Sequence, residues 1–341
     1  MRSVVTIRQV AEEAGVSIQT VSRVVNNRYD VAAETRQRVQ QAIERLGYQP
    51  NAIARGLVSR RSRTLGVVTY DLTDFFYTSV VAGAEEEAHN TGYVLMLGNS
   101  RRSVQEEPVY LHLLNERHVD GILFARESHT VGETHVITLA NSGIPVVMTG
   151  FKNPLLNTVD IDNIAGGRGA TECLIANDHR RIACITGPLS TLVAQERLQG
   201  CREALAAVGI CDHDLLVAEG DFSHRSGYQA MQQILSRVDQ QHLPFTAVFA
   251  HNDRMAIGAI SALRQAGFKI PEDVSIAGYD DIPEAEFADP PLTTIRQPMI
   301  SVGSEAIRLL VRHIDDPDLG PEQILLGTEL VWRQSVRRIA G

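Results

Sequence analysis

The 341-residue sequence has few of the features that mark membrane, disulfide-rich or zinc-binding proteins. Its four cysteines lie far apart with no Cys-x-x-Cys pair, so the pattern fits neither a zinc site nor a disulfide framework. We expect them to be small buried side chains in a reduced cytosol. A run of about 18 apolar residues is absent, which excludes a membrane span. Residues 1–5 lack the apolar segment of a signal peptide, so we expect a cytoplasmic protein without a membrane partner.

The motifs of several common enzyme classes are also absent. The sequence contains no G-x-S-x-G, Walker A, G-x-G-x-x-G or H-E-x-x-H pattern. Gly166-Gly167-Arg168-Gly169 has the wrong spacing for a phosphate loop and lacks its lysine, so we interpret these glycines as helix-packing residues. His251-Asn252-Asp253 is consecutive on one loop, which is poor geometry for a catalytic triad. We therefore predict no catalytic residues, no metal and no cofactor.

The charge is distributed unevenly along an otherwise ordinary globular sequence. The chain is 44% hydrophobic, and its length suits two or three domains of roughly 100–200 residues each. Residues 1–64 carry 11 arginines against 5 acidic residues, although the whole chain has a net charge of −9. A basic head on an acidic body favours a head that binds nucleic acid.

The head has the pattern of a helix-turn-helix. Thr6 and Gln9 have the spacing of a capping box, and apolar residues recur at helical spacing up to Gly15. Ser17 is a good N-cap for a second short helix over 18–25. Two short helices joined by a turn that contains glycine can place the second helix in the major groove.

The outward face of the second helix can read bases. The pattern points Ile18, Gln19, Ser22 and Arg23 outward. Glutamine can pair with adenine and arginine with guanine, whereas isoleucine can contact only apolar groups such as the thymine methyl. A helical hairpin packed on the body, with its arginines as solvated surface, is the alternative.

A third helix and a hinge follow. The third helix is predicted over 33–46, and Ala32 leaves its start without a good cap. The segment 52–59 is too short to hold a helix alone, so we expect it to order only on binding. Leu57 lies between arginines, as a minor-groove wedge requires, although a plain linker is the alternative.

Five stretches of the head together resemble the lactose/galactose repressor (LacI–GalR) family: Thr6-Ile7-Arg8-Gln9-Val10-Ala11, Ala14-Gly15-Val16-Ser17, Thr20-Val21-Ser22-Arg23-Val24-Val25-Asn26, Gly47-Tyr48-Gln49-Pro50-Asn51 and Ala54-Arg55-Gly56-Leu57. The resemblance implies two heads on a dimer that read a pseudo-palindromic DNA operator. The residues that we expect to contact DNA are Thr6, Ser17, Ile18, Gln19, Thr20, Ser22, Arg23, Asn26, Tyr48, Asn51, Ala54, Arg55 and Leu57.

The body alternates between strand and helix patterns, which predicts two doubly wound α/β lobes with parallel sheets. We expect strands over 65–70, 93–97, 121–124, 145–149, 182–186, 247–250 and 275–278, and helices over 76–90, 108–117, 137–141, 165–177, 194–208, 226–236 and 253–266. Two such lobes imply a cleft where the carboxyl ends of their strands face each other, which is the usual ligand position.

The body resembles the periplasmic-binding-protein-like effector domain of the same family. The matching stretches are Gly187-Pro188-Leu189, Arg197-Leu198-Gln199-Gly200, residues 252–259, Gly278-Tyr279-Asp280-Asp281 and Pro291-Leu292-Thr293-Thr294-Ile295. The resemblance implies a DNA-binding domain over 1–48, a hinge over 49–63 and a two-lobed body over 64–341. Lobe one would take about 64–161 and 294–326, and lobe two about 162–293 and 327–341. The chain ends soon after Trp332 without a long leucine-rich tail, so a homodimer is expected.

Polar and aromatic side chains at the strand ends are the candidate effector contacts. The resemblance favours Arg197, Phe222, Asn252 and Asp280, and Asp74, Phe75 and Phe76 follow the first strand of the body. Gly150 stands where some sugar-binding relatives have an aspartate, and Arg254 can also face the ligand. The loss of an anion and the gain of a cation favour an acidic or phosphorylated sugar.

The sequence therefore predicts a transcriptional repressor that binds an operator and responds to a small-molecule effector, most simply a sugar or sugar derivative. A cytoplasmic sugar-sensing protein that acts without DNA is the alternative, but it leaves the basic head unexplained. A sugar-modifying enzyme is disfavoured by the missing catalytic group.

Overall fold

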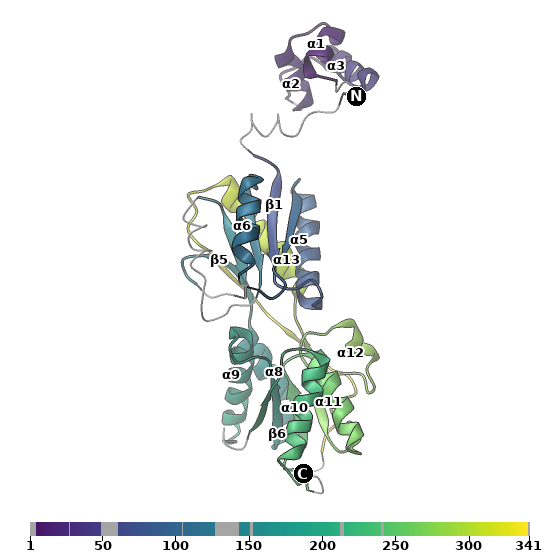
Figure 1. Cartoon of the computed structure of the whole chain (residues 1–341), viewed down its shortest axis with the longest axis vertical. Helices are drawn as coiled ribbons and strands as arrows, with labels where there is room; N and C mark the ends of the chain where they lie inside the picture. Colours follow the sequence, from purple (N-terminus) through teal and green to yellow (C-terminus); the bar gives the residue numbers. More distant parts are fainter. Residues whose placement is uncertain are drawn as a thin grey trace. The chain divides into compact units, whose positions relative to one another are not determined.

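The computed structural model describes residues 5–26, 28–48, 61–103, 105–126, 143–150, 153–211, 215–239 and 242–339. The chain divides into two units, Met1–Arg63 and Thr64–Gly341, whose helices and strands are drawn in Figure 1. Among the helices in these ranges, none is long and apolar enough to cross a bilayer.

The first unit contains three short helices, α1 (Ile7–Ala14), α2 (Ile18–Val25) and α3 (Ala33–Leu46). Their apolar faces meet in a small core that includes Val10 and Val21, both fully buried. The three helices have the bounds that the apolar spacing and the capping residues predict. A core this small explains why its buried positions are valine and alanine, since larger side chains would push the helices apart.

The helix ends of the first unit also agree with the sequence. The Thr6 amide donates to Gln9 Oε1 at 2.8 Å, and Ser17 Oγ accepts the amide three residues later at 3.1 Å. Gly15 ends α1 at φ 63°, a backbone conformation that favours glycine. Ala32 begins α3 without a side-chain cap. Local sequence therefore sets these boundaries.

The first lobe of the second unit is a six-stranded parallel sheet in the order β11-β5-β4-β3-β1-β2. The strands are β1 (Thr64–Thr69), β2 (Val94–Asn99), β3 (Gly121–Ala125), β4 (Val146–Thr149), β5 (Asn157–Ile161) and β11 (Gln323–Leu326). Helices α5 (Phe75–Asn90) and α13 (Met299–Asp315) cover one face, and α6 (Glu107–Glu116) lies on the other. Val67 packs toward α5 and Val68 toward α6, as the pleat of a strand requires.

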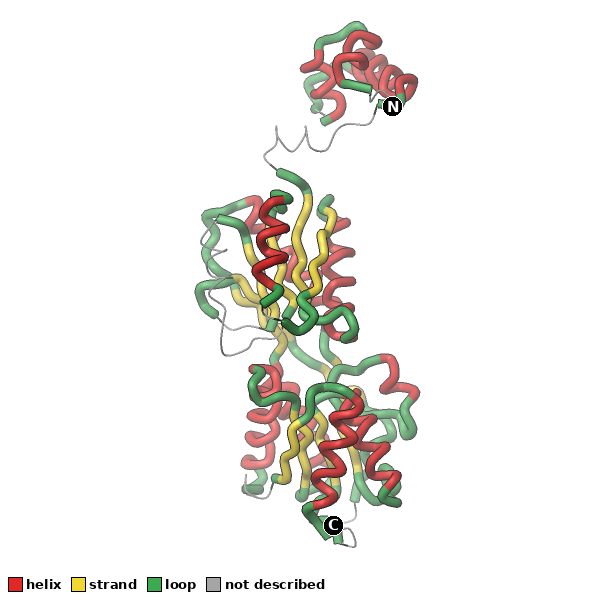
Figure 2. The backbone as a smooth tube through the Cα atoms, in the orientation of Figure 1, coloured by secondary structure: helices red, strands yellow, loops and turns green. Residues whose placement is uncertain are grey.

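The second lobe is a four-stranded parallel sheet in the order β7-β6-β8-β9. The strands are β6 (Ile182–Thr186), β7 (Leu216–Glu219), β8 (Ala247–Ala250) and β9 (Ser275–Ala277). Helices α8 (Asn163–Ala176) and α9 (Leu192–Ala207) pack on one face, and α10 (His224–Ser236) and α11 (Asp253–Gln265) on the other. Figure 2 shows the strands of both lobes enclosed by helices.

The chain passes between the lobes three times. It leaves lobe one after β5 and enters α8. It returns after β10 (Thr294–Arg296), near which isolated parallel bridges join Thr293 to Ala277 of β9 and Arg296 to Asp280. The last passage runs from β11 to β12 (Glu329–Val331), which pairs antiparallel with β10. Segments far apart in the sequence thus meet between the two sheets.

The predicted fold class is confirmed, but the element assignment was incomplete. Most strands and helices that were predicted in the body agree with the structure within a few residues, whereas the predicted helix over 137–141 lies outside the described residues. Helices α12 (Pro283–Phe287) and α13 and strands β5, β7, β10, β11 and β12 were not predicted. Most of these strands are short or carry polar residues, which hides the alternation on which a strand prediction depends. Of the cysteines, Cys211 is exposed, contrary to the prediction, and the other three are buried.

Each lobe is held together by helix pairs that cross at glycines. A Cβ built on Gly167 of α8 would lie 2.2 Å from the Arg197 carbonyl oxygen of α9, and one on Gly200 would lie 2.0 Å from the Ile164 oxygen. The pairs α5–α13 and α10–α11 have the same reciprocal arrangement at Gly83 and Gly303 and at Gly227 and Gly258. The interpretation of Gly167 as a helix-packing residue is therefore confirmed.

Candidate functional site

The exposed face of α2 carries the polar side chains that were predicted to contact DNA. Gln19 and Arg23 are exposed, and the Ile18 side chain is 44% exposed although it is apolar. An Arg23 Nη1–Asp30 Oδ2 contact of 3.6 Å holds the guanidinium near the turn after α2. The face combines hydrogen-bonding groups with one apolar contact, which is the mixture that base readout uses.

The remaining predicted DNA contacts divide into local caps and undescribed positions. Ser17 and Thr20 hydroxyls lie 2.9 Å apart, and Asn26 Nδ2 lies 3.4 Å from Ser22 Oγ. Thr6 is exposed and Tyr48 is partly buried in the first unit. Asn51, Ala54, Arg55 and Leu57, with the hinge segment 49–60, lie outside the described residues.

A cavity of about 60 Å³ lies between the two lobes of the second unit. The side chains and backbone that surround it come from the carboxyl ends of strands in both sheets and from the first turns of several helices. Its lining consists of Asp74, Phe76, Tyr77, Arg126, Thr149, Gly150, Val159, Asp160, Ile161, Asn163, Val193, Arg197, Phe222, Asn252, Asp280, Gln297 and Val302. Of the predicted effector residues, the cavity brings together Asp74, Phe76, Arg197, Phe222, Asn252 and Asp280.

Arg197 is the best-held polar side chain of the cavity. It is 5% exposed, its Nε donates to Asn163 Oδ1 at 2.9 Å, and it also donates to the His251 carbonyl. Its guanidinium carbon lies 3.8 Å from the centre of the Tyr279 ring, a cation–π contact. Because these contacts fix the plane of the guanidinium, its free edge can present donors in a defined direction.

Asp280 lies opposite Arg197, with 3.7 Å between Arg197 Nη1 and Asp280 Oδ1. It directly follows the turn after β9, has φ 115°, and accepts a hydrogen bond from Gln297 Nε2 at 2.5 Å. Burial raises the pKa of the Asp280 carboxyl to about 7, against the opposing influence of the nearby Arg197 charge. The carboxyl therefore changes its protonation near neutral pH.

Phe222 and Asn252 form the next part of the lobe-two wall. Asn252 caps α11 by accepting the Met255 amide at 2.9 Å, and its Nδ2 donates to the Phe222 carbonyl at 2.9 Å. A Cβ on Gly187 would lie 2.0 Å from Phe222 Cζ, so the phenyl ring lies directly on that glycine. The absence of a side chain at Gly187 thus leaves room for the Phe222 ring in the cavity wall.

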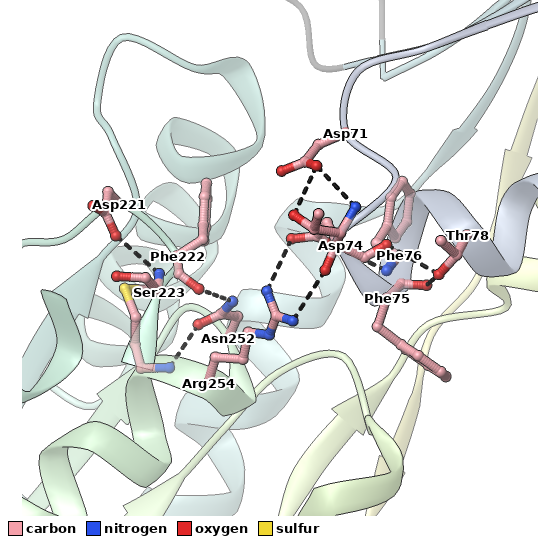
Figure 3. A network of polar contacts seen from close by, with 12 residues as sticks. Asp71, Asp74, Phe75, Phe76, Thr78, Asp221, Phe222, Ser223, Asn252 and Arg254 are labelled. Atoms are coloured by element: carbon pink, nitrogen blue, oxygen red, sulfur yellow. Dashed lines mark hydrogen bonds and ion pairs between the residues drawn. The ribbon is translucent and has the colours of Figure 1, made fainter. Parts of the chain in front are cut away.

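The remaining predicted effector residues lie at the start of α5 and across from it. Asp74 caps α5 by accepting the Phe76 amide at 2.9 Å, as Figure 3 shows. Phe75 and Arg254 do not line the cavity. Arg254 instead crosses to the first lobe, where its Nη2 donates to the Thr73 carbonyl at 3.2 Å and its Nη1 lies 3.8 Å from Asp74 Oδ2.

Several cavity residues were not predicted from the sequence. Arg126 is 3% exposed, follows β3 directly, and lies 3.5 Å from Glu107. It could have been found, because a charged residue at the end of a fully buried strand carries the same signal as Asp280. Asp160 and Gln297 could not, since they belong to β5 and to the segment after β10, which were not recognised as part of the sheets.

The sequence and the fold match known regulators. Residues 6–51 match the model of bacterial regulatory proteins of the lacI family, and residues 171–336 match that of a periplasmic binding protein-like domain. The HTH-type transcriptional repressor CytR of Escherichia coli is 37% identical over 335 residues, which cover 98% of this chain and 97% of CytR. This chain belongs to the LacI family. It is a transcriptional repressor of that family.

Two solved structures of LacI-family proteins resemble this one along nearly the whole chain. The lac repressor dimer bound to operator and to the anti-inducer ONPF has a TM-score of 0.86 at 31% identity, over 98% of this chain and 99% of its own. The CelR–cellobiose complex has a TM-score of 0.73 at 38% identity, over 97% and 99%. The predicted family and fold are thus confirmed.

Proposed function

We propose that this LacI-family repressor acts in the cytoplasm as a homodimer that binds a pseudo-palindromic operator and is controlled by a neutral sugar held between its lobes. The cavity around Arg197 and Asp280 is the observation that supports an effector site between the lobes. Its walls combine fixed donors, fixed acceptors and phenyl rings, which together suit the hydroxyl groups and apolar ring faces of a sugar. CelR, a relative, forms a complex with cellobiose.

The charges around the cavity favour a neutral effector over an acidic one. Arg126, Arg197 and Arg254 each have a carboxylate within 4 Å, from Glu107, Asp280 and Asp74 respectively. Arg254, the cation on which the expectation of an acidic sugar rested, is engaged outside the cavity lining. Paired charges still present directed hydrogen-bonding groups, but they offer little net attraction to a phosphate or carboxylate.

An exposed apolar face on lobe one supports a homodimer. Val94, Met96 and Leu97 of the edge strand β2 are 69%, 37% and 45% exposed, and Val109 and Leu113 of α6 are 52% and 45% exposed. The two elements touch where Tyr110 packs on Gly98. Clustered apolar side chains beside an edge strand are an interaction surface. The lac repressor, a family member, is a dimer on its operator.

The proposed function is tested by two independent measurements on the full chain. Selection from randomised DNA duplexes should enrich a pseudo-palindrome; enrichment of no sequence would contradict operator recognition. A thermal-shift panel of cellobiose, glucose, ribose, glucuronate and glucose 6-phosphate should show stabilisation by a neutral sugar, by about 2.7 kcal/mol at 100 times its Kd. Stabilisation by the acids alone would overturn the neutral-sugar assignment and leave the DNA assignment intact.

Arg23→Ala should relax the base preference of the head. We expect the selected operator to lose discrimination by about 1–3 kcal/mol at one base pair in each half-site, because one bidentate contact is removed. Arg45→Ala is the matched control, since Arg45 is an exposed arginine of α3 that pairs with Glu13. Binding curves on single-base operator variants measure the effect. An unchanged base preference in Arg23→Ala would show that this side chain does not read a base.

A further inference from the structure

The cavity between the lobes is too small to admit a sugar without movement. Its volume of about 60 Å³ is well below the roughly 300–1,000 Å³ of small-molecule sites. An effector must therefore widen the space between the lobes before it is enclosed. Contacts that join the two lobes beside the cavity resist that widening, and their strength affects how the effector enters and leaves.

Arg254 makes such a contact from an unfavourable position on its own helix. It is the second residue of α11, and a cation at a helix N-terminus is disfavoured by the positive end of the helix dipole. Its side chain reaches lobe one, where Asp74 and the Thr73 carbonyl receive it. The position of this arginine is thus explained by its partners across the cleft and not by the stability of α11.

Asp74 is placed to receive it without cost to its own helix. Its Oδ1 accepts the Phe76 amide as the N-cap of α5, which leaves Oδ2 directed to Arg254 Nη1 at 3.8 Å. The two side chains are only 29% and 18% exposed, so solvent screens the pair less than it screens a fully exposed one. One carboxylate therefore serves as a helix cap and as an interlobe partner.

The charge of Arg102 also extends toward lobe two, although its ion-pair partner lies in its own lobe. Arg102 of lobe one is bound to Asp71 at 2.7 Å, and its charge also reaches Asp221 of lobe two. Burial opposes ionisation of Asp221, but hydrogen bonds from Ser223 and Ser226, together with Arg102, lower the pKa of its carboxyl. Arg102 is therefore held by Asp71, and Arg254 is the arginine that pairs with a carboxylate of the other lobe.

We propose that Arg254 and Asp74 form an electrostatic clasp beside the cavity, which favours the closed arrangement of the lobes. The inference deepens the proposed function, because lobe closure is what would hold the effector. The clasp itself is a property of the chain without effector or DNA. Of the two residues of the clasp, Asp74 lines the cavity and Arg254 does not.

The clasp is tested by the distance between the lobes in the effector-free full chain. Spin labels at Glu86→Cys on α5 and Gln233→Cys on α10, both exposed, report this distance by pulsed electron resonance in a Cys211→Ser background. A small fraction of doubly labelled chain is mixed with excess unlabelled chain, so that distances within one chain dominate.

Arg254→Gln should raise the ratio of open to closed chains about two- to fivefold, as expected from the free energy of a partly exposed ion pair. Asp74→Asn, which keeps a cap oxygen, should give a similar shift, and the double variant should add little to either. Raising NaCl to 1 M should move the unsubstituted protein toward the Arg254→Gln distribution.

Arg264→Gln is the matched control on the same helix. Arg264 also belongs to α11 and forms an ion pair, but its partner Asp289 lies in lobe two, 2.7 Å away. The interlobe distances of the Arg264→Gln variant should equal those of the unsubstituted protein. Unchanged distances in Arg254→Gln, or an equal shift in Arg264→Gln, would overturn the clasp. Because the measurement uses neither sugar nor operator, its failure would leave the proposed function untouched.

Discussion

Gly167→Ala should destabilise the second lobe by on the order of 3 kcal/mol, whereas Gly169→Ala, two residues along the same helix, should not destabilise it. At Gly167 the added Cβ would lie 2.2 Å from the Arg197 oxygen and 2.8 Å from its Cα. Both atoms belong to backbone, so no side-chain rotation can relieve the overlap. Helices α8 and α9 would have to separate.

Gly169 faces a different environment. A Cβ there would meet only Ile295 Cδ1, at an ordinary distance of 3.8 Å. Replacement of a helical glycine by alanine then acts through helix propensity, which favours alanine by up to about 1 kcal/mol. The two substitutions are chemically identical, so their difference isolates the close approach of α8 and α9.

Thermal and urea unfolding of the two variants measure the difference. We expect a fall of about 6–12 °C in the unfolding midpoint of lobe two for Gly167→Ala. Because Gly167 lies against the backbone of Arg197, the variant should also bind effector more weakly. Equal midpoints for the two variants would contradict the packing of α8 on α9.

Asp280→Asn should abolish the effector response while operator binding persists. Two hydroxyl groups that donate to a carboxylate form charged hydrogen bonds of about 1.5–3 kcal/mol each, so we expect effector affinity to fall at least about 100-fold. Asparagine has nearly the shape of aspartate and tolerates the φ of 115° at this position better than most residues. The fold and the head should therefore remain intact.

The pH dependence of effector binding provides a sharper test of the same residue. The pKa of Asp280 is about 7, raised mainly by burial. Hydroxyl donors favour the ionised carboxyl, so effector affinity should fall as the pH drops below 7, by up to about tenfold per unit. In the effector-free protein, the folding stability depends on pH with the opposite sign. The raised pKa contributes stability that is present below about pH 4 and is lost as the pH rises through 7.

Titration calorimetry of the sugar identified by the panel, between pH 5.5 and 8.5, checks this prediction. In the unsubstituted protein, binding should release protons, and the heat should depend on the ionisation enthalpy of the buffer. The residual binding of Asp280→Asn should show no such dependence. Proton uptake on binding, or an affinity that is flat with pH in the unsubstituted protein, would place the contact elsewhere.

The sequence was most informative where structure is local. Thr6, Ser17 and Gly15 set the ends of two helices through hydrogen bonds and a backbone angle within a few residues, so the first unit could be predicted closely. In the body, strands such as β6 and β8 were recognisable because burial on both faces leaves almost only apolar residues. The short strands β10 and β12 have no such signature.

The candidate effector site divides in the same way. Arg197 and Asp280 were predicted because they lie within stretches that resemble the LacI family, and the structure brings both to one cavity. The role of Arg254 could not be predicted, because its partners Thr73 and Asp74 lie about 180 residues earlier. Its position in the sequence indicates a cation near the ligand, and only the crossing of the cleft shows that the cation is paired.

The sequence by itself determined the helix boundaries of the head, the family, the α/β class of the body and the residue types available for an effector. These depend on hydrogen bonds between near neighbours, on apolar periodicity and on charge counted along the chain. The tertiary structure decided which strand ends meet, that α13 returns to complete the first lobe, and which carboxylate faces each arginine. Such contacts join residues far apart in the sequence, so their geometry exists only once the two sheets have formed and the chain has crossed between them.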